Sequence, residues 1–171
     1  MFRKGLECLS DPYKVVMGRL LEELLRSFGD GLISVVVFGS VARGTARRDS
    51  DVDALIVAEK LPKSRLERLA LYLKAEERVD PLLDELLTEG YAVSITPILK
   101  TREEAGRVSP LYLDMTEEAV IVYDKDSFFE SVLLRLREEL SRLGSRRVWL
   151  GRKWYWVLKE DFKFGEAIVI E

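Results

Sequence analysis

The order of apolar and polar positions along the chain predicts alternating helices and strands. After Asp11-Pro12, apolar residues recur at helical spacing up to Phe28, and the glycine-rich residues 29–31 end that pattern. Asp is a favourable N-cap residue and Pro suits the first helical position, so we expect a helix to begin there. Residues 32–38 are too few for a typical helix and are rich in β-branched side chains, which predicts a buried strand.

The alternation of predicted strands and helices continues to Gly144. Residues 52–58 predict a second strand, Pro62 begins a helical region that Glu89-Gly90 interrupts, and residues 91–99 predict a third strand. Pro97 within it indicates an edge strand or a bulge. Residues 119–123 predict a fourth strand, and Asp126-Ser127 predicts the cap of a helix that ends at Gly144. We therefore expect an α/β (α+β) fold, with a mixed sheet of about four to five strands flanked by helices.

The last part of the chain has a different composition. Residues 1–144 predict one domain, and residues 145–171 form a tail in which arginine and lysine interleave with three tryptophans and a tyrosine. Aromatic and basic residues in this pattern can stack on nucleic-acid bases. They can also pack on the same domain, with the Arg and Lys stems lying over the rings, and we favour this second interpretation. Residues 167–170 predict a last, short strand.

Composition excludes several classes of site. The 171 residues include 27 Lys and Arg against 30 Asp and Glu, a net charge of −3, so no overall basic field for nucleic acid is present. There is no histidine, which excludes histidine bases and zinc ligands, and the single Cys8 cannot form an intrachain disulfide. The polar N-terminal stretch predicts no signal peptide, and no apolar run is long enough for a membrane span, so we expect a cytoplasmic protein with no membrane partner. The abundance of Arg, Glu and Leu hints at a thermophilic source.

Residues 38–53 join a strand end to a Gly-Ser pair. The buried strand stops at Gly39-Ser40, and a short helical turn is expected at residues 41–44. Glycine lets a phosphate approach the backbone, and backbone N–H groups at a helix start attract anions. The Ser40 hydroxyl can donate to the same oxygens, and Arg43 can add a fork-shaped positive charge. A P-loop is excluded, because Thr45 stands where that motif requires lysine.

Two carboxylates follow at the start of the next strand. Asp51 and Asp53 are two residues apart, so both side chains are expected on one face of the strand. Such carboxylates repel each other unless a cation lies between them, and oxygen ligands of this kind suit Mg²⁺. A phosphate-binding turn beside a carboxylate pair is the arrangement of metal-assisted nucleotidyl transfer.

This segment resembles the signature of the DNA polymerase β-like nucleotidyltransferase superfamily, in which Gly-Ser precedes Asp-hydrophobic-Asp by about ten residues. The form Gly-Ser-x-Ala-Arg-Gly-Thr…Asp-Ser-Asp-Val-Asp is similar to minimal nucleotidyltransferases and archaeal CCA-adding enzymes, and the match covers residues 35–58. The resemblance implies Mg²⁺ or Mn²⁺ on Asp51 and Asp53, and a nucleoside triphosphate on Gly39, Ser40 and Arg43. The nucleoside monophosphate would pass to a hydroxyl of an RNA, a small molecule or a protein.

One position departs from the family pattern. The superfamily supplies a third carboxylate from a later strand, and aligning that strand with residues 94–97 places Ser94 at the acidic position. Either Asp114 or Asp84 supplies the missing carboxylate, or the enzyme works with a different ligand set, or the domain binds nucleotide without transferring it. In the last case we expect a nucleotide sensor or an antitoxin-like partner of a helical protein. A homodimer is a further possibility, and the Leu-rich helices would supply its seam.

Overall fold

A mixed five-stranded sheet forms the centre of the computed structural model, which describes residues 1–163 and 165–168. The strand order is β1-β5-β2-β3-β4; β2 pairs antiparallel with β3 and β5, whereas β3–β4 and β1–β5 are parallel pairs. This arrangement confirms the predicted fold class and its mixed sheet. The strands are β1 (Arg3–Lys4), β2 (Leu32–Phe38), β3 (Val52–Ala58), β4 (Ile95–Thr101) and β5 (Val120–Asp124).

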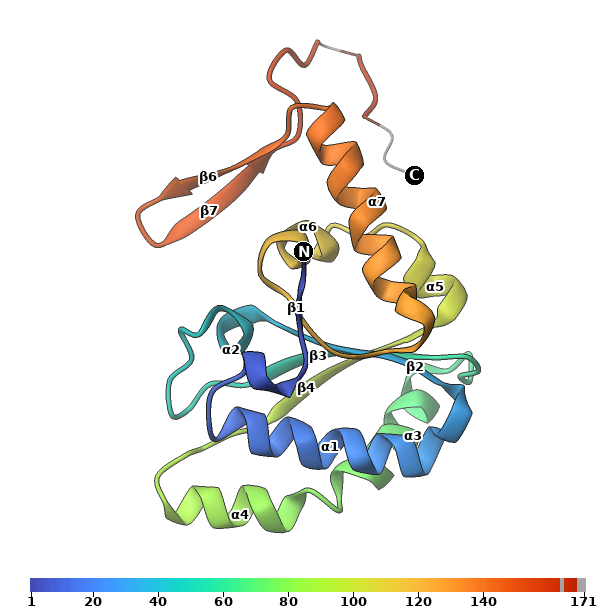
Figure 1. Ribbon diagram of the computed structural model, residues 1–171, viewed down its shortest axis with the longest axis vertical. Helices are drawn as coiled ribbons and strands as arrows, with labels where there is room; N and C mark the ends of the chain where they lie inside the picture. The colour runs from blue at the N-terminus through green and yellow to red at the C-terminus, as the bar shows by residue number, and fades with distance from the viewer. Residues whose placement is uncertain (164, 169–171) are drawn as a thin grey trace.

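Helices cover both faces of this sheet (Figure 1). One layer lies below the sheet in Figure 1 and comprises α1 (Tyr13–Phe28), α3 (Arg65–Glu76) and α4 (Asp80–Thr88). The opposite layer comprises α5 (Arg102–Gly106), α6 (Leu111–Glu118) and α7 (Phe128–Arg142), and the short helix α2 (Gly39–Arg43) directly follows β2. No described helix is long and apolar enough to span a membrane.

The central strand β2 is apolar on both faces because each face contacts a separate core. Val35 and Val37 pack in a cluster with residues of α1, whereas Val36 packs in a second cluster with residues of α6 and α7. A strand buried on both sides has a continuous apolar sequence instead of an alternating one, which explains why residues 32–38 could be predicted as a strand. Both cores include residues of β2 and β3, so the two strands are packed on both faces.

Several element boundaries differ from the prediction. The strand expected at residues 91–99 begins only at Ile95 and continues to Thr101, and the two-residue strand β1 was not predicted. Ser127 is the N-cap residue of α7 as expected, but its side chain forms no capping hydrogen bond. The N–H groups of Phe129 and Glu130 bond instead to the carboxylate of Asp124, each at 2.9 Å. Asp124 is the last residue of β5 and reaches the helix start from the sheet.

The position of Pro97 is explained by the sheet order. β4 is the outermost strand of the sheet, and its register with β3 runs without interruption from Val52↔Ile95 to Ala58↔Thr101. Pro97 therefore marks an edge strand and not a bulge. A proline costs no ladder hydrogen bond when its nitrogen faces away from the neighbouring strand.

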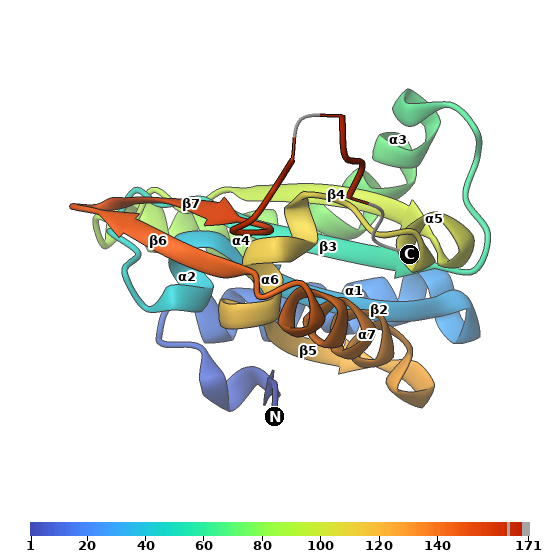
Figure 2. The same cartoon turned by 90° about the horizontal axis from the view of Figure 1, so that it is seen from above.

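The C-terminal region forms a hairpin apart from the main sheet. It consists of β6 (Arg146–Leu150) and β7 (Lys153–Val157), and Figure 2 shows it extending from the end of α7 toward α2. Of the strand expected at residues 167–170, residues 167 and 168 lie outside any strand, and residues 169 and 170 lie outside the described part of the chain.

Candidate functional site

The turn after β2 brings its backbone against a carboxylate of β3. Phe38 is the register partner of Asp53, so Gly39 begins α2 directly beside that side chain. Gly39 has a φ of 73°, and a Cβ at this residue would lie 2.3 Å from Oδ2 of Asp53. Only glycine permits both the left-handed backbone and this close approach. The Gly-Ser pair and the Asp pair, which are separated in sequence, therefore form one site.

The two predicted carboxylates lie where β3 begins. Asp51 directly precedes the strand and is exposed, and Asp53 is its second residue and half-buried. Phe38 and Leu55, which share a strand face with Asp53, pack with the α5–α7 layer. The carboxylates therefore occupy the sheet face covered by this layer.

Ser94, directly before β4, and Thr96, within β4, contribute hydroxyl groups to the same place. The Ser94 Oγ donates a hydrogen bond to Oδ1 of Asp51 at 2.5 Å, and the Val52 N–H bonds to the Ser94 carbonyl at 2.8 Å. Two residues further along each chain segment, Thr96 is the register partner of Asp53 and is exposed. Register partners on parallel strands have side chains on the same face of the sheet. Sequence reasoning found Ser94 but missed Thr96, because only the parallel register identifies it.

The electrostatic environment of Asp53 disfavours its charge. Burial, reinforced by the negative charge of Asp51, raises the pKa of Asp53 above its usual 3.8, and the positive charge of Arg43 partly offsets this. A carboxylate pair in which one member is hard to ionise is stabilised by a cation. The two carboxylates, with the hydroxyls of Ser94 and Thr96 beside them, therefore fit a divalent cation that completes its coordination with phosphate oxygens and water.

Arg43 is held beside the site by contacts outside the signature segment. Its Nη1 lies 2.5 Å from Oε1 of Glu118, a buried residue at the end of α6, and its guanidinium lies 4.9 Å from the ring centre of Trp154. The second oxygen of Glu118 pairs with Arg147 at 3.0 Å. Both α6 and the hairpin thus fix the arginine that was predicted to bind phosphate.

The hairpin packs on α6 through its tryptophans. The indole N–H groups of Trp154 and Trp156 both donate to Oδ1 of Asp114 at 2.8 Å. Trp149 stacks at an angle on Trp154, with ring centres 4.9 Å apart, and remains 51% exposed. These contacts are those expected if the tail packs on the same domain.

Neither acidic residue considered as a third metal ligand joins the pair. Asp114 accepts its two hydrogen bonds from the hairpin, and Asp84 lies on α4, in the helical layer on the opposite face of the sheet. Within residues 1–163 and 165–168, no group of three acidic, histidine or cysteine side chains is arranged to hold a metal ion. The site therefore offers two carboxylates and neutral hydroxyls.

The loop between α2 and β3 is anchored at its start and in its middle. The Thr45 N–H bonds to the Ser40 carbonyl at 2.9 Å, and the Tyr13 hydroxyl donates to the Arg47 carbonyl. Arg48 is exposed, and its guanidinium carbon lies 5.0 Å from the centre of the Tyr91 ring. This loop connects α2, which contains Ser40, to Asp51 before β3.

Comparison with known proteins gives matches in sequence and in structure. Residues 17–109 match the family model described as "Nucleotidyltransferase domain". A protein of Methanocaldococcus jannaschii named "Putative protein adenylyltransferase MJ1305" is 32% identical over 133 residues, which cover 75% of this chain and 83% of that protein. A mutant of the MntA–HpeT toxin–antitoxin pair shares 15% identity over 72% of this chain and 86% of its own, with a TM-score of 0.48. A toxin–antitoxin structure with AMP-PNP shares 18% identity over 73% of this chain and 90% of the matched chain, with a TM-score of 0.43.

Proposed function

Because this chain belongs to the nucleotidyltransferase domain family, we propose that it transfers the adenosine monophosphate unit of ATP to a hydroxyl group of a protein. The observation that carries the proposal is the contact between Gly39 and Asp53, which joins a Gly-Ser turn to a carboxylate pair. The name of the Methanocaldococcus jannaschii relative supports a protein as acceptor. RNA ends and small molecules are the other acceptors to be tested. A cytoplasmic location, where ATP is available, fits this activity.

The proposal assigns a role to each residue of the site. Asp51 and Asp53 would hold Mg²⁺ or Mn²⁺, which would offset the negative charge of the triphosphate. The Gly39 backbone and the Ser40 hydroxyl bind the β- and γ-phosphates, and Arg43 adds a positive charge that Glu118 and Trp154 keep nearby. The acceptor oxygen forms a bond to the α-phosphorus, the bond from that phosphorus to the bridging oxygen breaks, pyrophosphate leaves and the hydroxyl proton passes to solvent.

The activity is tested by label transfer. The protein is incubated with Mg²⁺ or Mn²⁺, a mixture of acceptor proteins, and ATP, CTP, GTP or UTP labelled at the α-phosphate. We expect label to enter protein from ATP and pyrophosphate to be released. ATP labelled at the γ-phosphate is the control, because it labels protein only through phosphorylation. Transfer should be lost in Asp51→Asn and Asp53→Asn.

The second candidate function is nucleotide binding without transfer, in a sensor or in a partner module of a helical protein. The observation that favours it is the hydroxyl of Ser94 at the third-carboxylate position. Absence of label transfer from all four nucleotides, together with metal-dependent nucleotide binding that Asp51→Asn abolishes, would select this function over the enzyme.

A further inference from the structure

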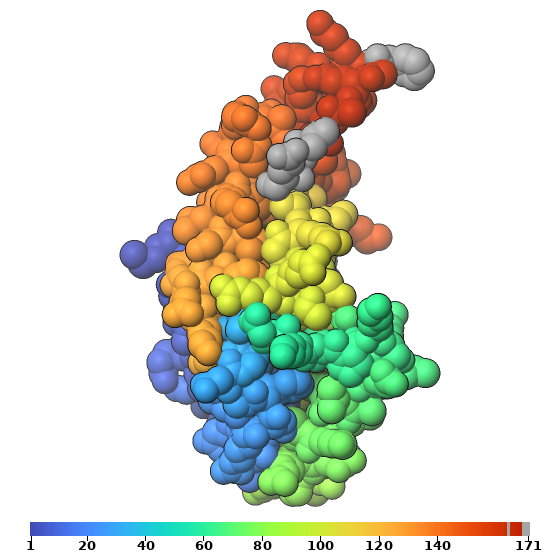
Figure 3. All heavy atoms as spheres, turned by 90° about the vertical axis from the view of Figure 1, so that its right-hand side faces the viewer, coloured from blue at the N-terminus to red at the C-terminus, as the bar shows by residue number. Residues whose placement is uncertain are grey.

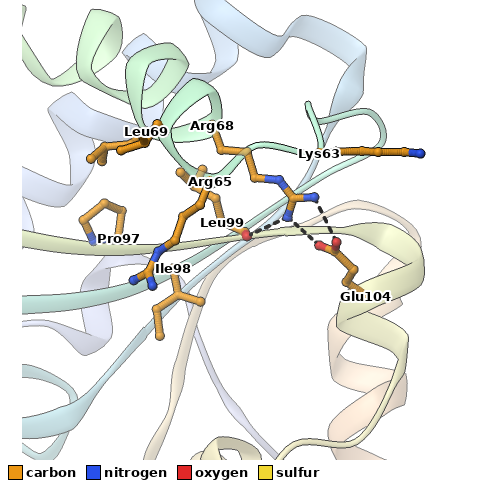
Figure 4. A pocket seen from close by; sticks show the side chains of 9 residues that line it. Lys63, Arg65, Arg68, Leu69, Pro97, Ile98, Leu99 and Glu104 are labelled. Carbon is orange, nitrogen blue, oxygen red and sulfur yellow. Dashed lines mark hydrogen bonds and ion pairs between the residues drawn. The ribbon is translucent and has the colours of Figure 1, made fainter.

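A cavity of about 420 Å³ opens at the free edge of β4, between α3 and α5. Its apolar lining comes from Leu66 and Leu69 of α3 and from Pro97, Ile98 and Leu99 of β4. Figure 4 shows Leu69 of α3 above these three residues of β4. Leu66 is 78% exposed and Leu69 is 38% exposed. In Figure 3, the green residues that include α3 project from the surface below the yellow residues of α5 and α6. Exposed apolar side chains gathered around a cavity, with polar residues at the rim, mark a binding surface.

The cavity lies next to the proposed catalytic carboxylates. Thr96 is the register partner of Asp53, and Ile98 lies two residues further along the same strand face. Two residues of a strand span about 6.6 Å. A chain lying along β4 could therefore place one side chain in the cavity while a residue about two positions away reaches Asp53.

The rim of the cavity carries uncompensated positive charge. Glu104 is the one carboxylate among the lining residues, and Arg68 binds it with two hydrogen bonds of 2.7 and 2.9 Å. Lys63 and Arg65 form no ion pair within residues 1–163 and 165–168. Figure 4 shows Arg65 extending from α3 toward Pro97 and Ile98, the end of the cavity nearer the carboxylates. The rim therefore complements an acidic group.

The backbone of β4 limits how an occupant can bind. Because the Ser94 carbonyl faces β3, the odd-numbered residues of the strand turn their backbone groups outward. Of these, Pro97 has no N–H, and the Leu99 carbonyl already lies 3.4 Å from Nη1 of Arg68. A long added strand would find too few partners at this edge, so the fit is to a short segment held by its side chains.

We propose that this cavity binds the acceptor polypeptide, as a short extended segment that carries the modified hydroxyl. An aliphatic side chain two residues from that hydroxyl fills the space between Leu66 and Ile98, and an acidic side chain beside it pairs with Arg65. The inference rests on the proposed transfer to a protein hydroxyl. The apolar lining of the cavity favours a polypeptide over a nucleic acid, because a sugar-phosphate backbone would leave Leu66 without an apolar partner.

The binding test uses fluorescent synthetic peptides and the full chain. Each peptide contains one tyrosine, a leucine two residues from it and a flanking glutamate; a second set carries lysine for the glutamate. Fluorescence anisotropy should show that Leu66→Asp and Arg65→Glu each weaken binding of the acidic peptide about tenfold. Arg65→Glu should also bind the lysine peptide more tightly than the wild type does. Leu87→Asp, at a 59% exposed leucine of α4, and Arg135→Glu, at an exposed arginine of α7, are matched controls and should bind like the wild type.

The outcomes separate this inference from the proposed function. Label transfer from ATP to protein, combined with peptide binding that neither Leu66→Asp nor Arg65→Glu changes, overturns the inference and leaves the function intact. Peptide binding that depends on both residues, without any label transfer, supports the docking surface and contradicts the enzyme. Tighter binding of a single-stranded RNA at the same residues, or a dimer that Leu66→Asp dissociates, also overturns the inference.

Discussion

Ser94 donates a hydrogen bond to the carboxylate of Asp51, and these two residues directly precede β4 and β3. The hydroxyl thus stands at the strand position from which the superfamily supplies its third carboxylate. It orients Asp51 without adding negative charge. Two carboxylates and a hydroxyl bind a divalent cation more weakly than three carboxylates do, because they supply less negative charge to balance that of the cation.

Replacing Ser94 with aspartate should make the melting temperature of the protein depend more strongly on bound metal. Two unit charges about 4 Å apart interact by about 1 kcal/mol in water, so the added carboxylate beside Asp51 should lower the melting temperature of metal-free protein by a few degrees. Saturating Mn²⁺ should raise the melting temperature of Ser94→Asp more than that of the wild type. Ser94→Asn, which adds no charge, is the control. An equal response of both variants to Mn²⁺ would contradict this role of the position.

Adding a methyl group at Gly39 should damage the site and not only the fold. Gly39 and Gly44 both have a φ of 73°, but a Cβ at Gly39 meets Asp53 whereas a Cβ at Gly44 meets no atom within 4 Å. Alanine in the left-handed region costs about 1–2 kcal/mol. Both Gly39→Ala and Gly44→Ala should therefore lose about this much free energy of unfolding in chemical denaturation. Only Gly39→Ala should also lose metal-dependent ATP binding, measured by calorimetry; equal binding by both variants would contradict the close-approach explanation.

Removing the charge of Asp53 should separate stability from activity. Burial and the neighbouring Asp51 both disfavour the Asp53 carboxylate, so its replacement by neutral asparagine relieves repulsion. We expect Asp53→Asn to unfold at the same temperature as the metal-free wild type or at a higher one. Nucleotidyl transfer should fall by roughly a hundredfold or more, because a pre-positioned charge at the reacting phosphates is lost. A less stable variant with full activity would show that Asp53 is only structural.

Asp114 should fix the hairpin through its two indole hydrogen bonds. All three tryptophans of the chain lie in β6 and β7, so tryptophan fluorescence reports on this hairpin alone. Asp114→Ala leaves the N–H groups of Trp154 and Trp156 without their acceptor, and the emission maximum should shift to longer wavelength. Asp114→Asn retains a side-chain oxygen and should shift it less. Faster tryptic cleavage in the hairpin of Asp114→Ala would be the second readout, and unchanged emission in both variants would contradict the role.

The ion pair at the cavity should make stability depend on acid pH. Hydrogen bonds from Arg68 and from the Thr101 backbone lower the pKa of Glu104 from 4.5 to about 2. A carboxyl whose pKa is depressed by folding stabilises the protein above pH 4.5, and this contribution is lost as the pH falls from 4.5 toward 2. Glu104→Gln should therefore cost about 1 kcal/mol or less at neutral pH, since the pair is partly exposed. Its stability should also fall less steeply over that acidic range in pH-dependent denaturation.

The sequence by itself determined the parts of the molecule that depend on local pattern. Residues 32–38 and 52–58 could be predicted as strands because both are apolar runs, interrupted only by Ser34 and by Asp53. The Gly-Ser pair at the end of the first run and the Asp pair at the start of the second could be joined in one hypothesis from their spacing. Pro97 pointed to an edge strand or a bulge, because a missing N–H is tolerated at both. These features follow from residue type and short-range geometry.

Only the tertiary structure decided which distant residues meet at the site. The parallel register of β3 and β4 places Ser94 and Thr96 beside the carboxylates, and the packing of α6 and the hairpin places Glu118 and Trp154 around Arg43. Strand register and helix packing depend on the burial of two cores by residues spread along the chain, so no local pattern contains them. The cavity at the edge of β4 arises in the same way, because Leu66 and Ile98 belong to elements that face each other only in the folded protein.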